Sequence, residues 1–145
     1  MTNPTALKFG YPNTLVAETR HWWVLVRPQQ PTFGSLVLVC KDEADAFSQL
    51  SPAAFADLQH AVVGIEAVLG RLVAYERINY LMLMMVDRDV HFHVIPRYEG
   101  AREDAGVSYV DAGWPGAPNL GAHVALNADA AAALARRLSD QWPKT

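Results

Sequence analysis

The stretch that decides the fold is Asp89-Val90-His91-Phe92-His93-Val94-Ile95-Pro96-Arg97. Its apolar and ionisable side chains alternate, which predicts a β-strand with the apolar residues 90, 92 and 94 on one face. The other face then presents Asp89, His91 and His93, with neighbours roughly 6–7 Å apart. A buried imidazole or carboxylate needs hydrogen-bond partners. We therefore expect this face to be solvated and to bind a ligand.

Composition narrows the class of protein. The chain has 145 residues, 51% of them hydrophobic and 19% charged, which suits a single globular domain over residues 1–145. With a net charge of −3, the chain lacks the excess of basic residues typical of nucleic-acid-binding proteins, so we expect no nucleic-acid partner. A small phosphorylated ligand remains compatible with this charge, because a few local donors can hold it.

The expected compartment is the cytoplasm. Cys40 is the single cysteine, so no intramolecular disulfide can form. The N-terminal residues have no signal-peptide pattern. The longest apolar stretch, residues 80–86, is too short to span a bilayer, so we expect no membrane partner.

The first half of the chain predicts three strands followed by a helix. The strands are expected over residues 14–17, 22–26 and 35–40, after an irregular segment over residues 1–13. Ser51 and Pro52 are typical of a helix start. Apolar residues then recur every three or four positions to residue 72, which predicts a helix of about five or six turns.

The second half predicts a hairpin, a loose segment and a last helix. Residues 77–85 form a strand, and residues 86–88 are expected to be a tight turn into the motif strand. Residues 99–126 have weak periodicity, and Asn127 is expected to cap a helix over about 128–140. The fold class is therefore α+β, with an antiparallel sheet, one long helix on a face and a C-terminal helix.

The motif strand has residue types suited to phosphate chemistry. A neutral imidazole is a good nucleophile near pH 7, and attack on phosphorus would divide one displacement into two easier steps. A second imidazole two residues away can donate a proton or a hydrogen bond. Arg97 has the geometry to bind phosphate oxygens bidentately.

These residues resemble the signature of the histidine triad family of nucleotide hydrolases and transferases, His-x-His-x-His followed by two apolar residues. Residues 89–95 and the following Pro96-Arg97 are similar to it, as are residues 22–26, 34–39 and 50–52 upstream. The resemblance covers residues 14–98. It implies a five-stranded antiparallel sheet with a long helix, and homodimers whose sheets join.

The resemblance also implies an activity and the residues responsible for it. The expected reaction is hydrolysis or nucleotidyl transfer at the α-phosphate of a nucleoside phosphate. His91 would be the nucleophile, and His93 would assist at the phosphate. No cofactor is required, although a divalent ion can accompany a polyphosphate.

The chain departs from the family pattern at several positions that bear on substrate binding. Asp89 stands where the first histidine belongs, Ser35 follows Gly34 where histidine is usual, and Arg27 occupies a ribose-binding position. Only residues 86–88 are expected between the last two strands, so the family's Gly- and Gln-bearing phosphate loop is missing or another segment supplies its function. Trp22 and Trp23 point to opposite faces, so one is expected in the core and the other against a base. The candidate substrate-binding residues are Arg97, Asp89, Arg27, Ser35 and Trp22.

Three alternatives remain open. Asp89, His91 and His93 would also suit a metal enzyme, with His21 or His123 as a further ligand. The protein could instead be a dimeric nucleotide-binding or scaffold protein that has lost turnover together with the family's phosphate loop. The two motif histidines would otherwise be ordinary surface residues on an edge strand.

Overall fold

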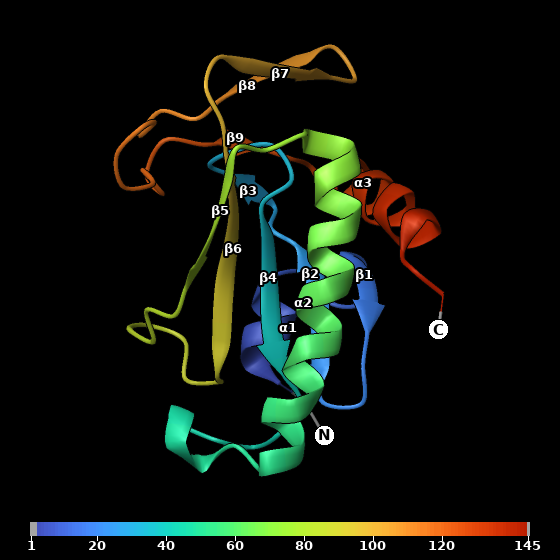
Figure 1. Ribbon diagram of the computed structural model, residues 1–145, viewed down its shortest axis with the longest axis vertical. Coiled ribbons are helices and arrows are strands. Elements are labelled where there is room, and N and C mark those ends of the chain that lie inside the picture. Colours follow the sequence, from blue (N-terminus) through green and yellow to red (C-terminus); the bar gives the residue numbers. More distant parts are fainter. Residues whose placement is uncertain (1–2, 145) are drawn as a thin grey trace.

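The computed structural model describes residues 3–144 and contains the predicted five-stranded antiparallel sheet. The strand order is β1-β2-β4-β6-β5. One long helix, α2, covers one face of this sheet, and a short helix, α1, lies on the other (Figure 1). The strands span β1 Leu15–Glu18, β2 Trp22–Val26, β4 Leu36–Cys40, β5 Arg77–Leu81 and β6 His91–Arg97.

Helix α2 spans Pro52–Val73 and begins where the sequence predicts. The Ser51 side chain accepts a hydrogen bond from the backbone N–H of Ala54, and Pro52 occupies the first turn. The helix is long and apolar enough to meet the length and composition criteria for a membrane span. Core helices meet the same criteria, and α2 buries one side in the main core. Its buried residues are Ala54, Ala61, Gly64, Ile65, Val68, Leu69 and Val73.

The remaining helices differ in how well the sequence predicts them. Helix α3, Ala128–Gln141, is capped by Asn127 as predicted. A 3-10 turn, η1, covers Phe47–Gln49. The predicted irregular N-terminus is wrong, because α1 spans Pro4–Lys8 and Asn3 caps it. Residues 1 and 2 of that prediction lie outside the described part of the chain.

The predicted tight hairpin is also wrong. Strand β5 ends at Leu81 and β6 begins at His91, so a loop over residues 82–90 joins them. Met85 and Val86 in this loop are among the most exposed apolar residues. Asp89 therefore precedes the motif strand and does not belong to it.

The segment after β6 is ordered and tied to the sheet. Strands β7 (Ala101–Asp104) and β8 (Val107–Val110) form a hairpin, and β9 (Val124–Ala125) pairs with β3 (Gln29–Gln30). Asp111, after β8, accepts hydrogen bonds from Nε and Nη2 of Arg97 at 2.7 and 3.1 Å. Both side chains are buried, so this bidentate pair fixes the segment against the end of β6.

Replacing Asp111 should strongly destabilise the fold. Asp111→Ala leaves a buried guanidinium without its counter-charge, and breaking such a pair costs about 3–5 kcal/mol. We expect that loss in the free energy of unfolding, measured by urea denaturation.

Asp45→Ala is the matched control, because it breaks the Asp45–Arg88 pair, in which both side chains are exposed. Exposed pairs contribute little, so this variant should unfold close to wild type. Equal losses in the two variants would contradict the role assigned to the buried pair.

Candidate functional site

The register of the central strands places the two motif histidines together. His91 lies opposite Val39 and His93 opposite Val37 in the β4–β6 pairing. Val37 and Val39 belong to the face turned away from α2. The two imidazole ring centroids are 5.1 Å apart, with the ring planes at 84°. The prediction that both rings project side by side from one face is confirmed.

The expectation that this face is open to solvent is wrong. His91 is 1% exposed and His93 is 7% exposed. Residues 3–14, which we call the N-terminal segment, run over this face of the sheet. Phe9 in this segment lies 6.4 Å from the His91 ring and 5.8 Å from the His93 ring, measured between centroids.

Phe9 anchors a second, smaller apolar cluster beneath the N-terminal segment. The Phe9 side chain is buried, and burying a residue of this size contributes about 1.5–3 kcal/mol. The two imidazoles thus lie at the border of this apolar cluster, and the short helix α1 is the only helix that covers it within residues 3–144. The buried members of the cluster are Ala6, Phe9, Leu25, Val37 and Val39.

His91 is held in one orientation by the backbone just before the strand. Its Nδ1 lies 2.7 Å from the carbonyl oxygen of Asp89. A carbonyl only accepts hydrogen bonds, so Nδ1 must be the protonated nitrogen. In the neutral ring, Nε2 then keeps a free lone pair, which is the form a nucleophile requires.

His93 is kept uncharged by its surroundings. Burial, together with the nearby charge of Arg27 and the neighbouring His91, lowers the pKa of His93 to about 4. Its Nδ1 is buried and has no hydrogen-bond partner within residues 3–144. His93 is therefore a neutral imidazole at physiological pH with an unused polar atom.

Arg27 is the one predicted substrate-binding residue whose charge acts on the imidazole pair. Arg27 directly follows β2, and its backbone N–H donates to the Ser35 carbonyl, which continues the β2–β4 pairing by one residue. Leu25, two residues before Arg27, lies in the same cross-strand row as Val37 and His93, so Arg27 lies on the face of the sheet that bears His93. Its Nη1 donates to the carbonyl of Gln29, whereas Nε is buried without a partner among the described residues. Burial lowers the pKa of Arg27. An anion near His93 would be stabilised by this guanidinium.

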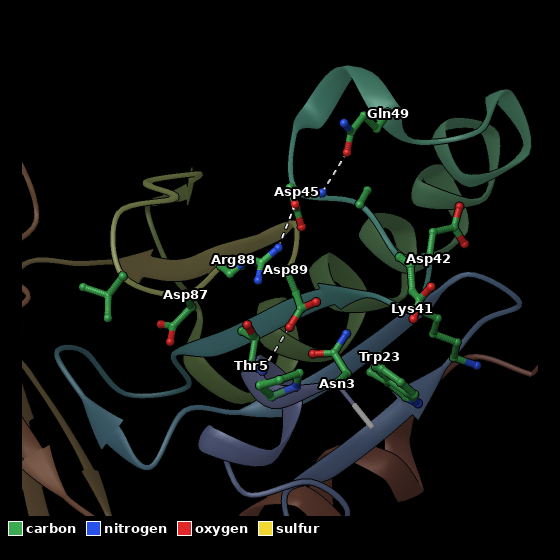
Figure 2. Close-up of a pocket in the computed structure, with 14 residues that line it drawn as sticks. Asn3, Thr5, Trp23, Lys41, Asp42, Asp45, Gln49, Asp87, Arg88 and Asp89 are labelled. Atoms are coloured by element: carbon green, nitrogen blue, oxygen red, sulfur yellow. Dashed lines mark hydrogen bonds and ion pairs between the residues drawn. The ribbon is translucent and has the colours of Figure 1, made fainter. Parts of the chain in front are cut away.

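Asp89 does not join the histidines in a metal or phosphate site. Its Oδ2 accepts a hydrogen bond from the backbone N–H of Thr5 at 3.1 Å, so the carboxylate points to the start of α1 (Figure 2). Within residues 3–144, no group of three or more His, Cys, Asp or Glu side chains is arranged to hold a metal ion. The patch of Asp89, His91 and His93 on which the metal alternative depends is not formed.

A cavity of about 590 Å³ lies beside Asp89 and the N-terminal segment. Carboxylates outnumber cationic groups around it, so it does not favour a phosphate. The charged residues that line it are Lys41, Asp42, Glu43, Asp45, Asp87, Arg88 and Asp89.

Three further candidate substrate contacts have partners within the protein itself. Arg97 is buried and uses its guanidinium on Asp111, Asn79 and the Gly116 carbonyl, so it is a structural residue. Ser35 is buried, and its hydroxyl donates to the Thr32 carbonyl. Trp22 packs in the main core and donates its Nε1 hydrogen to the Ala54 carbonyl.

The sequence reasoning missed the residues that cover the site. Phe9, Thr5 and Lys8 all belong to the segment that was expected to be irregular. A usable signal was present, because Asn3-Pro4 is the same kind of cap-and-proline helix start that located α2. The apolar residues that follow Pro4 would then mark a helix with a buried side.

Comparison with known proteins identifies the fold. No protein-family model matches the chain, and no curated protein matches it. A histidine triad protein from Sinorhizobium meliloti superposes with a TM-score of 0.74 at 20% identity, over 97% of this chain and 96% of that one.

Two more distant structures have the same architecture. A diadenosine triphosphate hydrolase from Plasmodium falciparum matches with a TM-score of 0.63 at 11% identity, over 89% of this chain and 76% of that one. A zinc-bound histidine triad family protein from Mycobacterium smegmatis gives 0.60 at 16% identity, over 97% and 95%. The chain therefore has the predicted histidine triad fold.

The buried, neutral His93 should make the protein less stable in acid. The pKa of His93 is about 4 when folded and near 6.5 when unfolded, so the unfolded chain binds the proton more readily between these values. Stability should be lost as the pH falls from 7 to 4, with His93 contributing on the order of 3 kcal/mol. Urea denaturation across this range measures the loss.

Carboxylates also titrate in this pH range, so variants are needed to separate the contribution of His93 to the loss of stability. His93→Gln should flatten the decline, whereas His60→Gln, which changes an exposed histidine, should not. A decline of the same size in wild type and His93→Gln would contradict the assignment.

Proposed function

We propose that this protein, built on the histidine triad fold, hydrolyses or transfers a nucleoside phosphate by covalent catalysis at His91. The observation that supports it best is the hydrogen bond between His91 Nδ1 and the Asp89 carbonyl. This bond fixes the tautomer in which Nε2 holds a lone pair. It would also stabilise the positive charge that the ring gains when Nε2 bonds to phosphorus.

The proposed reaction has two displacements. Nε2 of His91 attacks the α-phosphorus, a nitrogen–phosphorus bond forms, and the bond from phosphorus to the leaving group breaks. The leaving group takes a proton from solvent. Water then attacks the same phosphorus, loses a proton and releases the nucleotide, which restores the neutral imidazole.

Two further groups fit the phosphate. His93 is neutral, so it would donate one hydrogen bond to a phosphate oxygen and leave the charge to Arg27. The buried Nε of Arg27 has no partner within residues 3–144, and a phosphate oxygen would provide one. We expect turnover without a metal cofactor, because imidazole supplies the nucleophile; activity in the presence of EDTA tests this.

The structural comparisons are consistent with this class of reaction. One of the similar structures is a diadenosine triphosphate hydrolase, and others are described as histidine triad proteins. A dinucleoside polyphosphate and a nucleoside phosphoramidate are therefore the substrates to examine first.

A second candidate is a nucleotide-binding protein without turnover. The burial of both imidazoles under the N-terminal segment favours it. A nucleotide that raises the melting temperature and is never cleaved would support this candidate.

Replacing the proposed nucleophile should abolish turnover. His91→Gln keeps the side-chain size but removes the imidazole, so nucleotide release should fall by more than about 10³-fold. In wild type, rapid quenching at neutral or alkaline pH should trap a nucleotidyl adduct on the peptide containing His91, detected by mass spectrometry.

His60→Gln is the matched control and should retain wild-type rates, because His60 is exposed on α2. Equal rates of nucleotide release in wild type and His91→Gln would refute the nucleophile assignment.

We also propose that the protein forms a homodimer. Strand β5 lies at one edge of the five-stranded sheet, where its outer side has no strand partner within residues 3–144. Such an edge can pair with a second copy. Sedimentation at micromolar concentration should give twice the 16.0 kDa chain mass; a monomer would refute this proposal.

A further inference from the structure

The N-terminal segment is fastened over the imidazoles by contacts at its rim. The backbone N–H of Thr5 donates to Asp89, and Nζ of Lys8 pairs with Asp87 at 3.0 Å. Both acceptors lie in the exposed loop between β5 and β6 (Figure 2). Lys8 is half exposed, so the Lys8–Asp87 pair is a surface contact, of the kind that opens at modest cost. Lifting the segment must also break the hydrogen bond from Nδ2 of Asn3 to the Cys40 carbonyl and expose the buried Phe9.

The space beneath the segment is not a satisfied core. Nδ1 of His93 and Nε of Arg27 are both buried without hydrogen-bond partners in the described chain. Buried polar atoms normally have partners, and each exception calls for an explanation. A ligand with acceptor oxygens would satisfy both atoms, whereas Phe9, whose ring centroid lies 5.8 Å from that of His93, offers the imidazole only an apolar ring.

The chain also provides a pivot for the segment. Thr14, at its end, is joined to β2, where its carbonyl accepts from the backbone N–H of Val26. Between Phe9 and Thr14 lies Gly10 with φ of +93°, a conformation that favours glycine. A rotation near Gly10 that lifts α1 and Phe9 while Thr14 stays on the sheet must also break the buried hydrogen bond of 2.7 Å that the Thr14 hydroxyl donates to the Phe9 carbonyl.

We propose that the N-terminal segment is a removable cover, latched by Asp89, which a phosphate ligand displaces from His91 and His93. This inference rests on the proposed function, since it assigns the same imidazoles a ligand. Asp89 is then a positioning residue with two roles. Its carbonyl orients His91, and its carboxylate holds the cover closed.

Histidine modification by diethyl pyrocarbonate tests the latch without requiring turnover. Asp89→Ala removes the acceptor for Thr5 but keeps the carbonyl that binds His91. Loss of one such hydrogen bond should raise the open population, and hence the modification rate of His91 and His93, about fivefold. Peptide mapping by mass spectrometry reports each histidine separately, and exposed His60 and His123 serve as internal references.

Asp45→Ala is the matched control. It removes a carboxylate from the same cavity, but Asp45 pairs with Arg88 and makes no contact with the cover. Its modification rates should equal those of wild type. Lys8→Gln, which removes the surface pair with Asp87, should also raise the modification rates of His91 and His93. This second variant shows whether the effect of Asp89→Ala arises from release of the cover or from a local folding defect. Equal rates for His91 and His93 in all four proteins would overturn the proposal.

Displacement by ligand is tested by amide hydrogen exchange with adenosine monophosphate as the probe. Saturating nucleotide should speed exchange over residues 5–11 in wild type, and protection or no change there would overturn displacement. Failure of the proposed function is distinguishable. If no nucleotide is ever released but Asp89→Ala still exposes the imidazoles, the role of Asp89 in holding the cover closed is supported and the proposed hydrolase function is refuted.

Discussion

The backbone of Asp89 sets the chemistry that this fold can perform. Its carbonyl takes the Nδ1 hydrogen of His91, and that single bond decides which ring nitrogen keeps a lone pair. Its carboxylate, on the same residue, faces the start of α1. The orientation of the imidazole and the position of the N-terminal segment therefore depend on one residue, at the point where a loop becomes a strand.

The two faces of the sheet are packed very differently. On one side, α2 and α3 complete a large, continuous apolar cluster. On the other side, five residues form a thin apolar layer that borders two imidazoles and a guanidinium. The thick face therefore gives the domain most of its stability, and the imidazoles and the guanidinium, which are costly to bury, lie on the thin face.

The sequence predicts the main sheet and the two longer helices because their signals are local. Strand alternation, the Ser51-Pro52 start and the Asn127 cap each act over a few residues. The site was predicted less well because its contacts are long-range. Nothing in the order of residues reveals that Asp111 takes the guanidinium of Arg97, or that Phe9 covers a strand about eighty residues away. Trp22 and Trp23 alternate by rule, but periodicity alone could not say which of them faces the core.

The ion pair between Arg97 and Asp111 has a consequence for how the domain is divided. The sequence motifs that resemble the histidine triad signature end near Tyr98, whereas the structural match extends over 97% of the chain. A shortened protein ending at Tyr98 would retain both residues of the imidazole pair. It would also leave a guanidinium stranded in the sheet without its counter-ion, on the very strand that bears both histidines. Strand β6 and the segment after Tyr98 are thus one folding unit, and neither is expected to fold alone.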